Sequence, residues 1–251
     1  EGLFETVTEK EIPNLALLTD GAKEVFQNGG GIPFSINSIA IVYDKEKLGR
    51  EIKDWSDLWS EDLKGKVAIP DITTTGGPLF LSVAADKGGK ALKDDKGEAA
   101  FKALEELKPN IVKTYSKSSD LANMFQAGEV TVAVVVDFAI PTVKKANSNV
   151  VSVVPESGTY ANYNTVNIVK NAKNKENAYK YVNFRISTEN QTVKAKSLSE
   201  APVNKDVKLA DNEVKTMTYG DVAKRAKTVD FKLVNENLKA WIDQWNKILN
   251  Q

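Results

Sequence analysis

The strongest constraint on the fold of this chain is the alternation of short β-branched segments with helical ones. The clearest buried strand is Glu129 to Val136 (EVTVAVVV), and Ile32 to Tyr43 and Lys66 to Pro70 have the same character. Apolar residues recur at helical spacing over Gly97 to Leu107 and over Val234 to Leu249. This alternation predicts an α/β architecture with mostly parallel sheets, in which ligands bind at the carboxyl ends of the strands.

The remaining segments extend the same pattern. We expect a helical turn at 55–59 and further strands over 111–114, 150–154 and 163–169. Further helices are expected over 79–85, 118–127, 139–146, 175–184 and 188–196.

The residue types that are absent narrow the possible chemistry. The chain has no Cys and no His, so it has no thiolate nucleophile, disulfide or histidine base, and it lacks the commonest metal ligand. We therefore expect no cofactor or metal and favour a protein that is not an enzyme, although carboxylates and lysines alone can support catalysis. A carboxylate-dependent enzyme such as a glycosidase stays open as a distant alternative, with Asp71, Asp120 and Asp137 as its candidate carboxylates.

Charge and hydropathy say little about a macromolecular partner. Lys plus Arg and Asp plus Glu both total 34, so a nucleic acid partner is not expected. No stretch approaches the roughly 20 apolar residues of a membrane span. The first residues, Glu1 to Glu5, resemble neither a signal peptide nor a natural start, and we expect that further sequence precedes them.

One loop has the composition of an anion site. Thr73, Thr74, Thr75, Gly76 and Gly77 follow a predicted strand and precede a predicted helix. Hydroxyls and backbone N–H groups at a helix N-terminus suit an anion or another oxygen-rich group. A plain helix cap would use the same residues.

Polar residues also interrupt two of the predicted strands. Ser35, Asn37 and Ser38 lie within one, and a cluster lies at the start of another: Tyr160, Asn162, Tyr163 and Asn164. Buried polar groups need partners, which a ligand or a neighbouring loop could supply. A site for ferric iron would need several hard oxygen ligands close together, and Tyr160 and Tyr163 are too few to form one.

Several segments, in order, carry a family resemblance: IPFSINSIAIVYDKEKL, IKDWSDLWSEDLKGKVAIPD, FQAGEVTVAVVVD, VVPESGTYANYNTVNIVKNAKNKENAYKYVNF and SEAPVNKDV. Together they resemble the periplasmic spermidine/putrescine-binding proteins and related extracellular solute-binding proteins of bacterial ABC transporters. The resemblance implies the type II periplasmic-binding-protein fold, with two α/β lobes that close on a solute. The N-terminal strand and the βα units that usually follow it in this family are missing, so the first lobe is expected to be incomplete at its N-terminus.

By analogy the chain crosses between lobes near Asn37, near Asn162 and near Pro202 to Asn204. The expected first lobe comprises residues 1–37 and 164–203, and the second comprises 38–163 and 204–251. The implied partners are a small solute and a membrane permease. The implied protein is a monomer at the outer face of the cytoplasmic membrane or in the periplasm, with a lipid anchor as one form of attachment.

The ligand positions of the polyamine binders do not carry over. Their strand Asp and its neighbouring Trp correspond to Asn164 and Asn162, a second Trp to Val136, and their loop Glu to Thr74 or Thr75. Asp137 is left as a cation partner, although it could equally be a helix N-cap. We therefore expect a small polar solute that bears phosphate, phosphonate or carboxylate, with a polyamine as the alternative. The predicted ligand contacts are Ser35, Asn37, Ser38, Thr73, Thr74, Thr75, Gly76, Asp137, Asn162, Tyr163 and Asn164.

Overall fold

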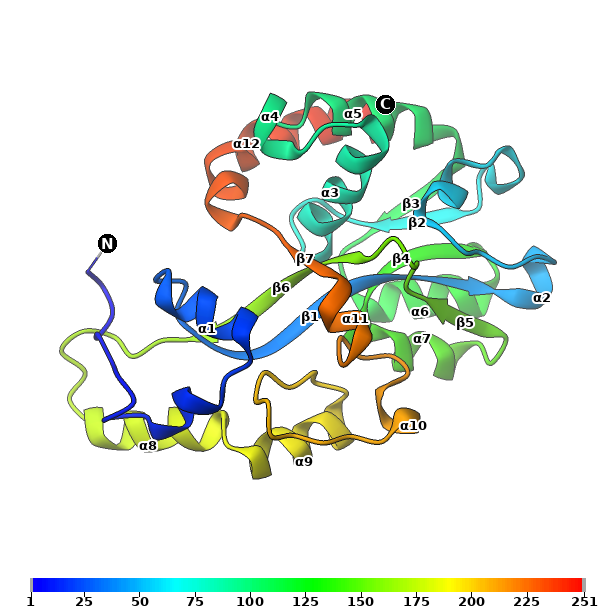
Figure 1. The fold of residues 1–251 in the computed structure, drawn as a ribbon. Helices are drawn as coiled ribbons and strands as arrows, with labels where there is room; N and C mark the ends of the chain where they lie inside the picture. The colour runs from blue at the N-terminus through cyan, green and yellow to red at the C-terminus, as the bar shows by residue number, and fades with distance from the viewer. Residues whose placement is uncertain (1, 250–251) are drawn as a thin grey trace. The chain divides into compact units, whose positions relative to one another are not determined.

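A computed structural model describes residues 2–249 as two compact units (Figure 1). Among the described residues, unit 1 contains 2–37 and 163–219, and unit 2 contains 38–162 and 220–249. The chain therefore passes from one unit to the other after Asn37, after Asn162 and after Tyr219. The ends of the expected lobes at Glu1, Asn250 and Gln251 lie outside the described residues.

The third crossing differs from the expected one after Val203. Residues after Val203 remain hydrogen-bonded to the N-terminal segment of unit 1, since Lys205 N donates to Leu17 O over 2.9 Å. Tyr219 closes the segment through a 2.9 Å hydrogen bond from its hydroxyl to Val207 O. These hydrogen bonds hold residues 204–219 within unit 1.

The strands form one mixed sheet in the order β3-β2-β4-β1-β6-β7, with β5 paired to β1. Their bounds are β1 Ile32–Asp44, β2 Val67–Pro70, β3 Ile111–Tyr115, β4 Val132–Val136, β5 Val150–Val153, β6 Thr159–Val166 and β7 Ala226–Thr228. Strands β3, β2 and β4 are parallel, as expected, but β1 runs antiparallel to β4 and β5. β1 is the long strand that enters unit 2 from unit 1, and this direction makes the sheet mixed.

Helices cover both faces of the sheet in unit 2 (Figure 1). One face carries α3, α5 and α12, and the other carries α6 and α7. The elements of this unit are α2 Lys45–Leu48, η2 Trp55–Trp59, η3 Glu61–Leu63, α3 Gly76–Gly88, α4 Leu92–Asp95, α5 Glu98–Leu107, η4 Lys108–Asn110, α6 Ser118–Ala127, η5 Asp137–Ala139, α7 Ile140–Ala146, α11 Asp221–Arg225 and α12 Phe231–Leu249, where η marks a 3₁₀ helix.

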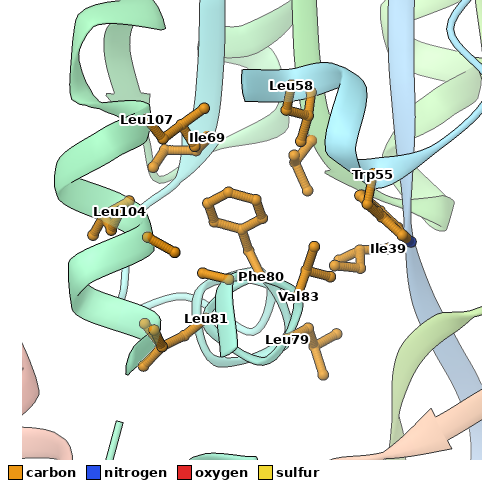
Figure 2. Packing of buried hydrophobic residues seen from close by; sticks show 14 of the residues in the cluster. Ile39, Trp55, Leu58, Ile69, Leu79, Phe80, Leu81, Val83, Leu104 and Leu107 are labelled. Carbon is orange, nitrogen blue, oxygen red and sulfur yellow. The ribbon is translucent and has the colours of Figure 1, made fainter. Parts of the chain in front are cut away.

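The main core of unit 2 lies around α3. Ten successive residues of this helix, Gly76 to Ala85, are buried, because α3 lies between the sheet and α5. Figure 2 shows the fully buried Phe80 ring extending from α3 into the space between Ile69, Leu58 and Leu104. Burial of a side chain of this kind stabilises the fold by roughly 1.5–3 kcal/mol.

Unit 1 holds together partly through buried amide side chains. Its elements are η1 Pro13–Leu17, α1 Asp20–Gln27, α8 Lys175–Arg185, α9 Thr188–Leu198 and α10 Asp211–Val214, together with the adjoining parts of β1 and β6. Gln191 donates to Phe34 O over 2.6 Å and accepts from Val203 N over 2.8 Å. One side chain thus ties α9 to β1 and to the segment after α9, satisfying buried backbone groups of both.

Candidate functional site

The threonine loop opens onto a cavity at the carboxyl ends of three strands of unit 2. The cavity has a volume of about 130 Å³. Pro70, Tyr115 and Val136, the last residues of β2, β3 and β4, all line it. Because these strands are parallel, their carboxyl ends meet at one edge of the sheet, where ligands of α/β proteins commonly bind.

Hydroxyl groups dominate the polar part of this cavity, which we call the threonine pocket. Its lining is Pro70, Thr74, Thr75, Gly76, Tyr115, Ser116, Ser118, Val136, Phe138 and Ala139. No lining residue carries a charged side chain. Burial raises the pKa of Tyr115, whose hydroxyl donates to Val134 O over 2.8 Å, so this side chain stays neutral. The pocket therefore offers hydroxyls and peptide groups rather than fixed charges.

Two helices begin at the threonine pocket. α3 starts at Gly76 and α6 at Ser118. Neither helix has a side-chain cap hydrogen bond at its N-cap residue, Thr75 or Lys117, within the described chain. The first turn of an α-helix has N–H groups without intrahelical partners and carries partial positive charge. Two uncapped N-termini at one pocket favour an acceptor-rich or anionic guest.

The three threonines have different surroundings. Thr73 donates its N–H (2.9 Å) and hydroxyl (2.5 Å) to the Asp71 carboxylate and does not line the pocket. Thr74 lines the pocket, but its hydroxyl donates to Asp71 O over 2.7 Å. Thr75 lines the pocket and is exposed. A local turn therefore accounts for the Thr73 hydroxyl and the Thr74 hydroxyl, and Thr75 is the threonine best placed to contact a ligand.

The glycines of this loop serve packing. A Cβ at Gly77 would overlap the backbone of Asp71 and Ile72, and one at Gly76 would lie 3.0 Å from Pro70. Pro78 follows within the first turn of α3, where its missing N–H costs nothing. Only glycine allows the helix to start this close to the strand it follows.

The predicted carboxylates lie outside the lining of the threonine pocket. Asp137 is buried in η5, and its Oδ1 accepts from Phe138 N over 2.8 Å. Asp120, on α6, accepts from the Ser119 hydroxyl over 3.4 Å. Asp71 is engaged by Thr73. Among residues 2–249 there is no group of three or more acidic side chains placed to hold a metal ion.

The polar residues of β1 and β6 divide between the units. In unit 1, Asn164 donates to Ser35 Oγ (2.9 Å) and to Asn37 Oδ1 (2.6 Å), so the chain itself supplies partners for these strand residues. Tyr163, also in unit 1, lies against Gly21 of α1, and burial followed by the nearby Glu24 raises its pKa. Ser38 and Asn162 belong to unit 2 and are buried.

Among the described residues predicted to contact the ligand, Asn162 has a buried side-chain atom without a hydrogen-bond partner. Its Oδ1 atom is buried and accepts no hydrogen bond from the described part of the chain. Buried acceptors in native proteins nearly always have a partner. A ligand with an N–H or O–H group would donate the missing hydrogen bond to this oxygen.

Seven lining residues of the threonine pocket were not predicted as contacts: Pro70, Tyr115, Ser116, Ser118, Val136, Phe138 and Ala139. Ser116 and Ser118 follow β3, and Phe138 follows β4. The rule that located the threonine loop, a polar segment after a parallel strand, applies equally to Ser116 and Ser118. Phe138 is 47% exposed, and no local sequence pattern distinguishes it from a core phenylalanine.

Comparisons with known proteins agree with this architecture. The sequence profile of the bacterial extracellular solute-binding protein family matches residues 1–224. An ABC transporter protein from Clostridium perfringens, known from a crystal structure, is 52% identical in sequence to this chain. The two structures superpose with a TM-score of 0.90, and the match covers 99% of this chain and 78% of the other.

Two curated relatives are more distant. The spermidine/putrescine-binding periplasmic protein of Escherichia coli is 26% identical over 73% of this chain and 53% of its own. The γ-aminobutyric acid-binding protein of Pseudomonas aeruginosa is 27% identical over 82% of this chain and 58% of its own. This chain thus spans about half the length of the curated relatives that it matches.

None of the helices within residues 2–249 is both long and apolar enough to cross a membrane. The family profile covers most of the chain, and the fold superposes closely on a solved ABC transporter structure at 52% identity. The chain belongs to the bacterial extracellular solute-binding proteins.

Proposed function

We propose that this chain is the solute-binding component of an ABC importer, which captures a small polar solute outside the cytoplasmic membrane, delivers it to a permease and performs no chemistry. Family membership and the 52% identity to an ABC transporter structure support this role. Binding proteins of this kind act by shifting between conformations that differ in affinity for the solute. In this proposal the threonine pocket of unit 2 forms part of the solute site.

The solute we favour bears a carboxylate, phosphonate or phosphate group. The observation that carries this choice is the pair of uncapped helix N-termini, of α3 and α6, at a pocket lined by Thr75, Ser116 and Ser118. Their N–H groups and hydroxyls supply donors to an oxyanion. The ligand named for the Pseudomonas relative, γ-aminobutyric acid, carries such a carboxylate.

Asn162 supports a solute that also bears a donor group. Its buried Oδ1 needs a hydrogen-bond donor, which an ammonium or hydroxyl group would provide. An oxyanion at one end of the solute and an amine or hydroxyl at the other would use both features. Ser35, Asn37, Ser38, Tyr163 and Asn164 remain proposed ligand contacts.

A polyamine is the second candidate, because the Escherichia coli relative is named for spermidine and putrescine. Polyamine ammonium groups need carboxylates. The lining of the threonine pocket carries none, and Asp137, outside that lining, already accepts from Phe138 N. The geometry of this pocket therefore favours the anionic solute.

Isothermal titration of the native gene product with γ-aminobutyrate, 2-aminoethylphosphonate, inorganic phosphate and spermidine tests the choice. We expect a saturable signal with at least one of the three anion-bearing compounds. Binding of spermidine alone, weakening steeply with added salt, would replace the anion proposal with the polyamine one. Absence of binding to the whole panel would count against both.

A further inference from the structure

A second cavity in unit 2, of about 310 Å³, shares no lining residue with the threonine pocket. It lies among η2, the second half of α3, the segment before β6 and strand β7. Trp55, Trp59 and Tyr160 supply aromatic rings to its lining. We call it the tryptophan pocket.

Two of these rings already interact with ammonium groups of the chain. Lys87 Nζ lies 5.6 Å from the centroid of the Trp59 ring, and Lys227 Nζ lies 5.3 Å from that of Tyr160. Cations within about 6 Å of an aromatic face are attracted by the quadrupole of the ring. The lining therefore has the geometry that accommodates an ammonium ion.

The acidic groups of the tryptophan pocket accept hydrogen bonds from groups other than the two lysines. Asp86 accepts from the Tyr160 hydroxyl at 2.9 Å and pairs with Lys227 at 3.2 Å. Asp54 caps η2 by accepting from Ser56 N over 3.0 Å, and it also accepts from the Ser157 hydroxyl over 2.9 Å. Both carboxylates sit on short side chains that are anchored by these hydrogen bonds.

Lys87 and Lys227 are both exposed, and the Lys227 side chain is 57% accessible. Long, exposed lysine side chains move into water at little cost, because surface ion pairs contribute at most about 1 kcal/mol. When both lysines turn outward, the pocket retains three aromatic rings and two carboxylates. The fixed part of the site is thus anionic and aromatic.

We propose that the tryptophan pocket is a second binding site, which takes a small organic ammonium ion against Trp59, Tyr160 and Asp86 as Lys87 and Lys227 turn outward. Burial and the Asp86 hydrogen bond raise the pKa of Tyr160, so its hydroxyl remains the donor that orients Asp86. This site is independent of the solute proposed for the threonine pocket, because the two pockets share no lining residue.

Nuclear magnetic resonance of the indole N–H signals tests the proposal. The chain has four tryptophans, and Trp241 and Trp245, buried in α12, are internal controls for Trp55 and Trp59. The probes are choline and its neutral isostere 3,3-dimethylbutan-1-ol. We expect choline to shift the Trp59 signal saturably and the isostere to bind at least tenfold more weakly.

Variants separate cation binding from simple apolar binding. We expect the Lys87→Met/Lys227→Met double variant to bind choline several-fold more tightly, because the competing ammonium groups are gone, and Asp86→Asn to bind it at least tenfold more weakly. Equal binding of choline and the isostere, no effect of Asp86→Asn, or no saturable shift in the double variant would each overturn the proposal.

A variant of the threonine pocket, Thr75→Val, serves as the matched control. It should leave choline binding unchanged while it weakens the anionic solute, so failure of one site is distinguishable from failure of the other. Thermal unfolding followed by circular dichroism verifies that each variant is folded.

Discussion

Asn164 on β6 donates a 2.6 Å hydrogen bond from its side-chain amide to Oδ1 of Asn37 on β1. The same amide also reaches the Ser35 hydroxyl at 2.9 Å. Polar residues that interrupt the apolar pattern of β1 thus have a partner on β6. The pairing reduces the need for a ligand at Ser35 and Asn37.

Replacement of Asn164 by Ala should therefore lower stability. The buried oxygens of Ser35 and Asn37 lose a donor, and a lost partner of a buried polar group costs about 1–3 kcal/mol. Urea unfolding of Asn164→Ala measures the cost, and Asn177→Ala on the exposed surface of α8 is the control. Equal stability of the two variants would show that the pairing contributes nothing.

Removal of the Thr75 hydroxyl should weaken binding of an anionic solute. Hydrogen bonds to charged groups contribute about 1.5–3 kcal/mol, so Thr75→Val should lower affinity about tenfold or more. Titration of the tightest-binding anion of the panel measures the loss. Thr73→Val is the matched control, since Thr73 lies outside the lining and its hydroxyl donates to Asp71. A larger loss for Thr73→Val would contradict the assignment.

A methyl group at Gly77 should destabilise unit 2. The added Cβ would overlap the backbone of Asp71 and Ile72, and overpacking of this kind costs about 1–3 kcal/mol. Thermal and urea unfolding of Gly77→Ala test this. The control Thr75→Ala, at an exposed position two residues earlier, should change stability by less than about 0.5 kcal/mol.

The cap of η2 should make stability depend on pH in acid. Hydrogen bonds from Ser56 N, then from Ser157, lower the pKa of Asp54 below its ordinary 3.8. The charged form is therefore favoured in the folded state. Its contribution is fully present above the unfolded-state pKa and is lost as the pH falls through the lower, folded-state value.

Asp54→Ala should accordingly cost about 1 kcal/mol at neutral pH, the usual cost of a lost cap, and less below about pH 4. Asp54→Asn retains a capping oxygen without a titrating group, so its unfolding free energy should lack this pH dependence. Unfolding measured from pH 2 to pH 7 compares the three proteins. A difference between wild type and Asp54→Ala that is constant over this range would contradict the assignment.

Much of unit 2 was predictable from local pattern. The apolar run before Asp137 forms β4, although pairing begins only at Val132 because Glu129 lies in the turn after α6. The helix expected over 79–85 begins at Gly76, since Pro78 fits its first turn. Amphipathic spacing from Val234 onward predicted α12, and Trp241 and Trp245 are buried on its apolar face.

Pairing direction and the partners of polar side chains were not predictable in the same way. The antiparallel course of β1 depends on long-range pairing with β4 and β5, which no local pattern encodes. Thr73 and Thr75 look alike in sequence, yet only the fold directs one hydroxyl to Asp71 and places the other beside the pocket. The threonine loop could be located from the sequence, but its individual contacts could not.

Strands β1 and β6 each contribute residues to both units, with the division after Asn37 in one strand and after Asn162 in the other. A recombinant fragment that contained either unit alone would inherit two severed strands. Chimeras designed to exchange solute specificity between homologues should therefore graft loops such as 71–77 and leave both strands uncut.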